Sequence, residues 1–191
     1  MGLNSALVVS TAVTGMQQLK ELLAQCGIAR VEFVQSASFA RELLKTAEFD
    51  LYLINSPLRG ESVDAFAQYL TERLAGEVLV LVREDKLQET SRRMTEFGVF
   101  AVSKPLNRDE FLSVVKMATA SHSRVGMIRR ENEKLKQSIE DIKVINRAKL
   151  VLVSRLAMSE PEAHKYIEKQ AMDLRKTSRS VADGILKTHE G

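Results

Sequence analysis

Asn55 lies in the middle of the most informative stretch of the chain, DLYLINSPLRG (residues 50–60). The apolar run 51–54 before it predicts a buried strand that delivers Asn55 to a loop at its carboxyl end. Open parallel α/β sheets place their functional groups at this edge. An amide forms hydrogen bonds, but it is neutral and a poor nucleophile. We therefore expect Asn55 to form hydrogen bonds and not to react.

Two further polar sites follow predicted strands. Ser10-Thr11 come at the end of ALVVS (6–10), and Lys104 comes directly after VFAVS (99–103). None of these positions carries a carboxylate, whereas a Mg²⁺ site needs several hard, charged oxygens. We therefore expect no metal site, and a hydrogen bond between Asn55 and either Lys104 or loop backbone. The plainer alternative is that Asn55 is a structural asparagine of a turn.

Other residue types that could react or bind a metal are scattered. Cys26, the single cysteine, falls on the apolar face of a predicted helix and is expected to be a buried thiol. His122, His164 and His189 lack the spacing of metal ligands, and there is no glycine-rich phosphate loop. The sequence therefore predicts a protein that is not an enzyme and binds no cofactor.

The elements that must position Asn55 and Lys104 alternate between strand and helix over the first 120 residues. Gly27, Gly76 and Gly98 are expected to end helices, and Ser38 and Asn107 to cap them. The predicted strands are 6–10, 31–35, 51–55, 78–82 and 99–103, and the predicted helices are 15–27, 38–48, 61–76, 86–98 and 107–120. Such alternation predicts a flavodoxin-like α/β fold, a doubly wound parallel five-stranded sheet.

Residues 1–120 resemble the receiver domain of two-component response regulators, through DLYLIN and through SKP (103–105). The resemblance implies an acidic pair after the first strand, an aspartate acceptor and a Ser or Thr after the fourth strand. This chain has Ser10-Thr11, Asn55 and Val82-Arg83 there, and keeps the receiver lysine, Lys104. It is therefore expected to be a pseudo-receiver that is regulated without phosphorylation, for instance by a regulatory protein.

Residues 121–147 can be written as a heptad pattern that predicts a coiled-coil dimerisation helix. The a positions are Val125, Asn132, Ile139 and Asn146, and the d positions are Ile128, Leu135, Ile142 and Lys149. Asparagines buried at a positions pair with their twins and favour a parallel dimer in fixed register. The alternative is a single amphipathic helix packed on its own domain.

Residues 148–191 predict a small three-helix bundle. Ser159-Glu160-Pro161-Glu162 has the pattern of a capping box. One helix is therefore expected to end near Leu156, and the next to start at this capping box. The second helix should run to about Arg175 and a third should start near Thr177 or Ser178. The residues expected to face inward are Ala163, Ile167, Gln170 or Ala171, Leu174, Val181, Ala182 and Ile185.

This segment resembles the ANTAR domain, the RNA-binding module of bacterial transcription antitermination regulators. The matching pieces are Ala148-Lys149, the SEPEA turn, QAMDLRK and VADGIL. A pseudo-receiver, a coil and this module in that order also resemble the amidase-operon antiterminators. The RNA-binding residues expected from the resemblance and from charge are Ala148, Lys149, Lys165, Lys169, Arg175, Lys176 and Arg179. Exposed lysines are ordinary on amphipathic helices, so charge alone is a weak argument.

The charge of the 191 residues is uneven. Residues 1–120 hold 13 Lys/Arg and 15 Asp/Glu, whereas residues 121–191 hold 15 and 10. This basic excess favours a polyanionic partner. A single cysteine and no apolar run long enough for a secretory signal or a membrane span predict a cytoplasmic protein without a membrane partner.

The resemblance, together with these features, implies a homodimeric antiterminator that binds stem-loops in nascent leader mRNA and prevents a terminator hairpin from forming. Two other classes of function stay open. One is a dimeric adaptor that binds proteins and no RNA. The other is a response regulator phosphorylated at an atypical site.

Overall fold

The computed structural model describes residues 2–190 and divides into two compact units, residues 1–127 and 128–191. We call them the receiver-like unit and the helical unit. The strands of the first are β1 (Ser5–Ser10), β2 (Arg30–Val34), β3 (Leu51–Asn55), β4 (Glu77–Arg83) and β5 (Phe100–Lys104). Its helices are α1 (Met16–Gln25), α2 (Ala37–Leu43), α3 (Val63–Arg73), the 3₁₀ turn η1 (Glu84–Lys86) and α4 (Leu87–Thr95).

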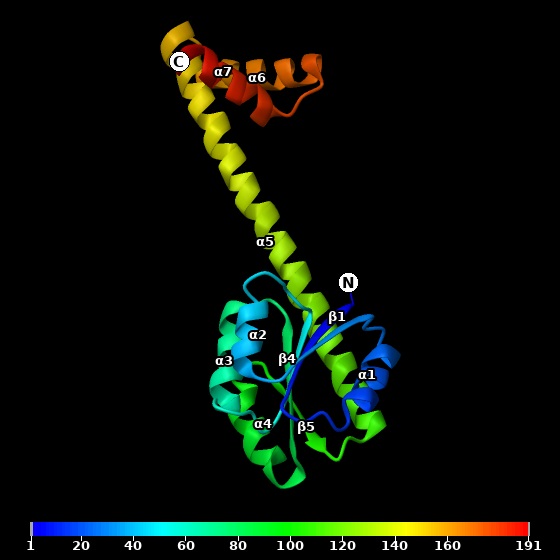
Figure 1. Ribbon diagram of the computed structural model, residues 1–191. Helices are drawn as coiled ribbons and strands as arrows, with labels where there is room; N and C mark the ends of the chain where they lie inside the picture. Colours follow the sequence, from blue (N-terminus) through cyan, green and yellow to red (C-terminus); the bar gives the residue numbers. More distant parts are fainter. Residues whose placement is uncertain (1, 191) are drawn as a thin grey trace. The chain divides into compact units, whose positions relative to one another are not determined.

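The five strands form one parallel sheet in the order β2-β1-β3-β4-β5, which confirms the predicted fold class (Figure 1). The order reverses at β1, next to β3, and this is where open sheets of this kind leave a crevice at their carboxyl edge. The register pairs Ser10 of β1 with Asn55 of β3. Two of the polar residues singled out in the sequence therefore end neighbouring strands.

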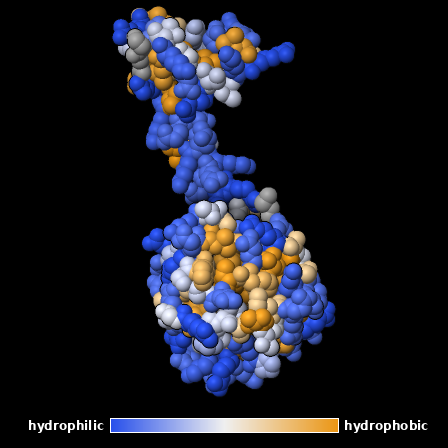
Figure 2. All heavy atoms as spheres, in the orientation of Figure 1, coloured by the Kyte–Doolittle hydropathy of each residue, from blue (hydrophilic) through white to orange (hydrophobic). Residues whose placement is uncertain are grey.

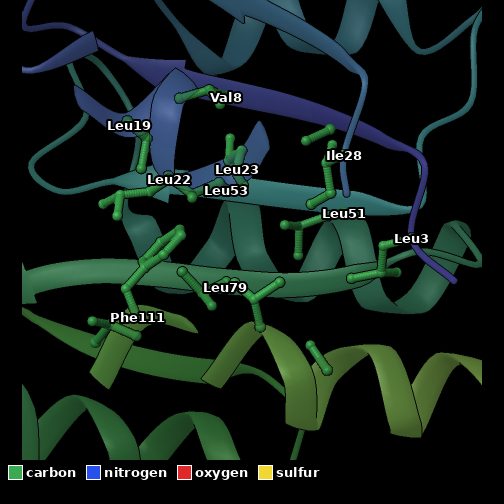
Figure 3. Packing of buried hydrophobic residues seen from close by; sticks show 14 of the residues in the cluster. Leu3, Val8, Leu19, Leu22, Leu23, Ile28, Leu51, Leu53, Leu79 and Phe111 are labelled. Atoms are coloured by element: carbon green, nitrogen blue, oxygen red, sulfur yellow. The ribbon is translucent and has the colours of Figure 1, made fainter. Parts of the chain in front are cut away.

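Apolar side chains cover both faces of the sheet, as buried parallel strands require. One cluster joins alternate strand residues such as Val8, Leu53 and Leu79 to α1 and to the start of α5 (Arg108–Leu156) (Figure 3). The other cluster joins the opposite face to α2, α3 and α4. Figure 1 shows the same two layers of helices on either side of the sheet.

Two helix starts differ from the prediction. The N-cap of α2 is Ser36, whose hydroxyl accepts from the Phe39 backbone N–H at 3.2 Å, and not Ser38. The fourth helix begins as the 3₁₀ turn η1 before it continues as α4. Both differences are at helix ends, where boundaries vary by one or two residues and 3₁₀ turns are common.

Helix α5 runs without interruption from Arg108 to Leu156, through the segment predicted as a coil. Asn107 caps it as predicted, because its side-chain oxygen accepts from the backbone N–H groups of Asp109 and Glu110 at 2.9 and 3.1 Å. Gly126, within the helix, does not break it. None of the helices in residues 2–190 is long and apolar enough to cross a membrane.

The helical unit packs α6 (Glu160–Leu174) and α7 (Ser178–Glu190) against the end of α5. The capping box is present: the Ser159 N–H donates to the Glu162 carboxylate at 2.8 Å. The buried core consists of Ala148, Leu152, Ala163, Ile167, Ala171, Val181 and Ala182. The prediction that Leu174 faces inward is wrong: its side chain, one residue before the left-handed Arg175 that ends α6, is 54% exposed.

Candidate functional site

A chain of hydrogen bonds joins the polar residues at the carboxyl edge of the sheet. Lys104 Nζ donates to Asn55 Oδ1 at 2.8 Å and also to the backbone oxygen of Ser56. Asn55 Nδ2 donates to Ser10 Oγ at 3.0 Å, and Ser10 donates in turn to the Ala12 carbonyl at 2.8 Å. The expected hydrogen bond between Asn55 and Lys104 is therefore present. The Asn55 side chain accepts one hydrogen bond through its oxygen and donates one through its nitrogen.

The electrostatics of this edge do not suit a divalent cation. Burial lowers the pKa of Lys104, and no carboxylate among the described residues forms an ion pair with it. Within residues 2–190 no cluster of three His, Cys, Asp or Glu residues has metal-site geometry. An amide held by a cation can neither attack a phosphoryl group nor neutralise Mg²⁺.

Cys26 lies at the C-terminal end of α1 and is half-buried. Burial raises the pKa of its thiol, and nearby Lys116 offsets this only partly. A raised pKa keeps a cysteine as a thiol, whereas the nucleophile in cysteine chemistry is the thiolate. The geometry therefore indicates that Cys26 contributes to the packing of the core.

The apolar members of the predicted coil are exposed in the single chain. Val125, Ile128, Leu135, Ile139 and Ile142 retain between 40% and 58% of their accessible surface. Asn132 and Asn146 are also exposed to solvent. We call these seven residues the seam. Figure 2 shows that the visible side of this part of α5 is mainly hydrophilic, so the apolar residues are a minority along it.

Three of the residues predicted to bind RNA have structural contacts instead of free surfaces. Ala148 is completely buried in the core of the helical unit, so its side chain cannot reach RNA in this fold. The Lys149 side chain is only 16% exposed and lies 3.0 Å from Glu160. Arg179 is held between Asp141 and Asp183, at 3.0 Å from each. The hydrogen bond to Asp183 is the largest cause of its raised pKa.

The other four predicted cations are on the surface. Lys165 and Lys169 are exposed on α6, and Arg175 and Lys176 are exposed in the turn between α6 and α7. Arg175 has φ 52°, a left-handed conformation that turns the chain from α6 towards α7. Lys176 also lines a groove of about 330 Å³ between the two helices, together with Tyr166 and His189.

Sequence reasoning missed the groove and the contacts that residues before 148 make with the rest of the helical unit. Asp141 bonds to Arg179, and Val144 and Ile145 pack against the core, although all three precede residue 148. The missed signal was the apolar pair Val144-Ile145, which lies off the heptad a and d positions. A second apolar stripe on a coil helix indicates a second packing surface.

The family comparison also includes residues before 148. Residues 133–186 match the model of the ANTAR domain. The chain carries an ANTAR domain. The matched range takes in the Asp141–Arg179 ion pair and all of the buried core of the helical unit.

Curated relatives with regulatory names are similar to this chain. The chain is 27% identical over 175 residues to the transcriptional regulatory protein PdtaR of Mycobacterium tuberculosis, a match that covers 89% of this chain and 83% of PdtaR. It is 28% identical over 85 residues to the aliphatic amidase regulator of Pseudomonas aeruginosa, which covers 44% and 43% of the two chains. Both relatives are named as regulators and not as enzymes.

Solved structures confirm the fold of the first unit. The signal receiver domain of an HD domain-containing protein from Pseudomonas fluorescens Pf-5 has a TM-score of 0.58 at 19% identity and covers 66% of this chain and 94% of that one. A response regulator receiver domain protein from Clostridium thermocellum has a TM-score of 0.56 at 17% identity, with 64% and 99% coverage. The chain thus combines an ANTAR domain, matched over residues 133–186, with a unit of receiver fold.

Proposed function

We propose that this protein is an RNA-binding transcription antiterminator. The observation that carries the proposal is the match of residues 133–186 to the ANTAR domain. Four exposed cations, Lys165, Lys169, Arg175 and Lys176, support it, because lysine and arginine hold the phosphates of a folded RNA. The bound RNA is a stem-loop in nascent leader mRNA, and its stabilisation excludes the terminator hairpin.

The groove between α6 and α7 suits one unpaired loop base. Tyr166 is 39% exposed beside it, and Lys176 lines the same groove. Bases splayed out of an RNA loop stack on aromatic side chains, and their phosphates pair with neighbouring cations. We therefore assign base contact to Tyr166 and phosphate contact to Lys169 and Lys176.

Dimerisation through the seam supplies two ANTAR domains for two stem-loops. The seam presents five apolar side chains to solvent in the single chain, and a second copy of α5 would cover them. Binding of the first stem-loop then raises the effective concentration of the second. The receiver-like unit is controlled without phosphoryl transfer, since Asn55 and Ser10 stand where a receiver has acidic residues.

RNA binding by the full chain tests the proposal. Each phosphate contact contributes about −0.7 to −0.9 to the slope of log affinity against log salt. Lys169→Gln and Lys176→Gln should each flatten the slope by roughly one contact and weaken all stem-loops alike. Tyr166→Leu should cost about 1 to 3 kcal/mol for the preferred loop and leave the slope unchanged.

Lys20→Gln is the matched control, because it removes one exposed charge from α1 of the receiver-like unit. It should leave both affinity and slope as they are. Transcription of a template with a terminator then measures read-through with and without protein. A full chain that binds structured RNA no better than Lys169→Gln/Lys176→Gln would contradict RNA binding and favour the protein-adaptor function.

A further inference from the structure

A cavity of about 200 Å³ opens at the carboxyl edge of the sheet, next to the Lys104–Asn55–Ser10 hydrogen bonds. Its polar wall contains these three residues. Its apolar wall contains Leu19 of α1, Leu81 of β4 and Leu106 of the loop before α5. The cavity therefore combines a polar end with a larger apolar surface, as binding sites for small organic molecules do.

Among the described residues, Lys104 is the one ionisable side chain that lines this cavity. Its ammonium group has three donors, and the protein supplies two acceptors, Asn55 Oδ1 and the Ser56 carbonyl oxygen. Burial lowers the pKa of Lys104, because the charged ammonium loses part of its hydration there. An anion in the cavity would accept the third hydrogen bond and balance the charge.

The start of α1 adds to the positive electrostatic potential that Lys104 produces in the cavity. Gly15 and Met16 line the cavity, and the first turn of α1 has neither an acidic residue nor a side-chain cap. The positive end of the helix macrodipole therefore reaches the cavity without local compensation. Lys104 and this helix end act in the same direction, because both favour a negative ligand.

We propose that this cavity binds a small organic carboxylate. The carboxylate accepts a hydrogen bond from Lys104, and a short apolar chain packs against Leu19, Leu81 and Leu106. At about 30 Å³ for each water-sized group, the volume admits roughly six non-hydrogen atoms. An inorganic anion would fill the polar end and leave the apolar wall exposed to water.

The proposal does not depend on RNA binding, since it concerns the receiver-like unit alone. Leu106 precedes the first residue of α5 by two positions, with Asn107 as the cap between them. A ligand in the cavity thus contacts the loop from which the long helix starts. This gives a pseudo-receiver an input of its own that requires neither phosphate nor metal.

Titration of the full chain with sodium butyrate, followed by amide NMR, tests the site. Saturable shifts are expected at the Asn55 side chain, at Gly15 and at Leu106. Lys104→Met keeps the apolar stem and removes the charge, and should bind butyrate at least about tenfold more weakly. The neutral isostere butyramide should bind the unchanged protein more weakly by a similar factor. Lys20→Met, the matched control, should stay within about twofold of the unchanged protein.

Thr14→Leu provides a variant that does not disturb the core, because Thr14 is exposed at the cavity wall. Its added bulk should weaken butyrate binding while the melting temperature stays unchanged. No saturation at about 100 mM butyrate, where even a site with a Kd of about 1 mM is filled, would overturn the proposal. Equal binding of butyrate by Lys104→Met, or of phosphate and butyrate by the unchanged protein, would also overturn it.

Discussion

Lys104 Nζ lies 2.8 Å from Asn55 Oδ1, so the ammonium of β5 is held by a neutral amide at the end of β3. In a phosphorylated receiver this amide would be a carboxylate nucleophile. The replacement keeps the geometry of a cation at the strand ends and removes the group that reacts. We therefore expect the receiver-like unit to have the fold of a receiver without phosphoryl transfer.

The first prediction concerns phosphorylation. Acetyl phosphate with Mg²⁺ should leave the mass of the protein unchanged, because Ser10, Thr11 and Asn55 offer neither an acceptor carboxylate nor charged oxygens to hold Mg²⁺. Intact-protein mass spectrometry measures this. A stable adduct of about 80 Da that disappears in Asn55→Ala would mean that an atypical acceptor operates here.

The second prediction concerns the seam. Changing Ile139 and Ile142 to Asp should convert a dimer into monomers, since each substitution would bury an unpaired charge in the interface. Sedimentation gives the oligomeric state. Lys134→Gln with Gln137→Glu changes the net charge equally at exposed positions off the seam, and this control should remain dimeric. Dimers that persist in the Asp variant would place the interface elsewhere.

The third prediction compares two glycines. A Cβ at Gly76 would collide with the backbone oxygen of Phe49 and with the Tyr52 ring, so Gly76→Ala should lower the free energy of unfolding by about 1 to 3 kcal/mol. Gly126 lies within α5, where an added Cβ would meet no other atom within 4 Å, so Gly126→Ala should raise helix stability by about 0.5 to 1 kcal/mol. Urea denaturation measures both, and equal effects would contradict the close packing at Gly76.

The fourth prediction concerns pH. Burial alone would raise the pKa of Asp50, but hydrogen bonds from Asn4 and Ser5 and the nearby His122 lower it overall. A carboxylate with a lowered folded-state pKa stabilises the protein above its unfolded pKa of about 3.9, and this contribution is lost as the pH falls through the folded value.

Asp50→Asn removes that titration. Its free energy of unfolding should be lower than that of the unchanged protein at pH 7, and the difference should shrink as the pH approaches about 3. Urea denaturation at a series of pH values follows it. Glu48→Gln, an exposed neighbour for which no hydrogen bond is expected to change, is the control. A difference that is constant with pH would contradict the lowered pKa.

Local sequence patterns predicted the strands, several helix caps and the type of side chain at position 55. The apolar runs predicted the five strands and their alternation with helices along the chain, because a buried parallel strand must be apolar on both faces. The capping box at Ser159 and the cap at Asn107 were readable because a cap and its helix are only a few residues apart. The replacement of an acidic acceptor by Asn55 was equally plain, since residue type alone decides whether a side chain can be a nucleophile.

Only the tertiary structure decided which of the predicted residues are available. Ala148 is buried by helices that follow it in the chain, and Arg179 is held by Asp141, 38 residues away. The register that places Ser10 beside Asn55 joins residues 45 positions apart. Periodicity reports the polarity of a helix face, but the partner of that face is set by packing between distant segments. For the same reason the cavity beside Lys104, which several separate segments enclose, is a property of the fold.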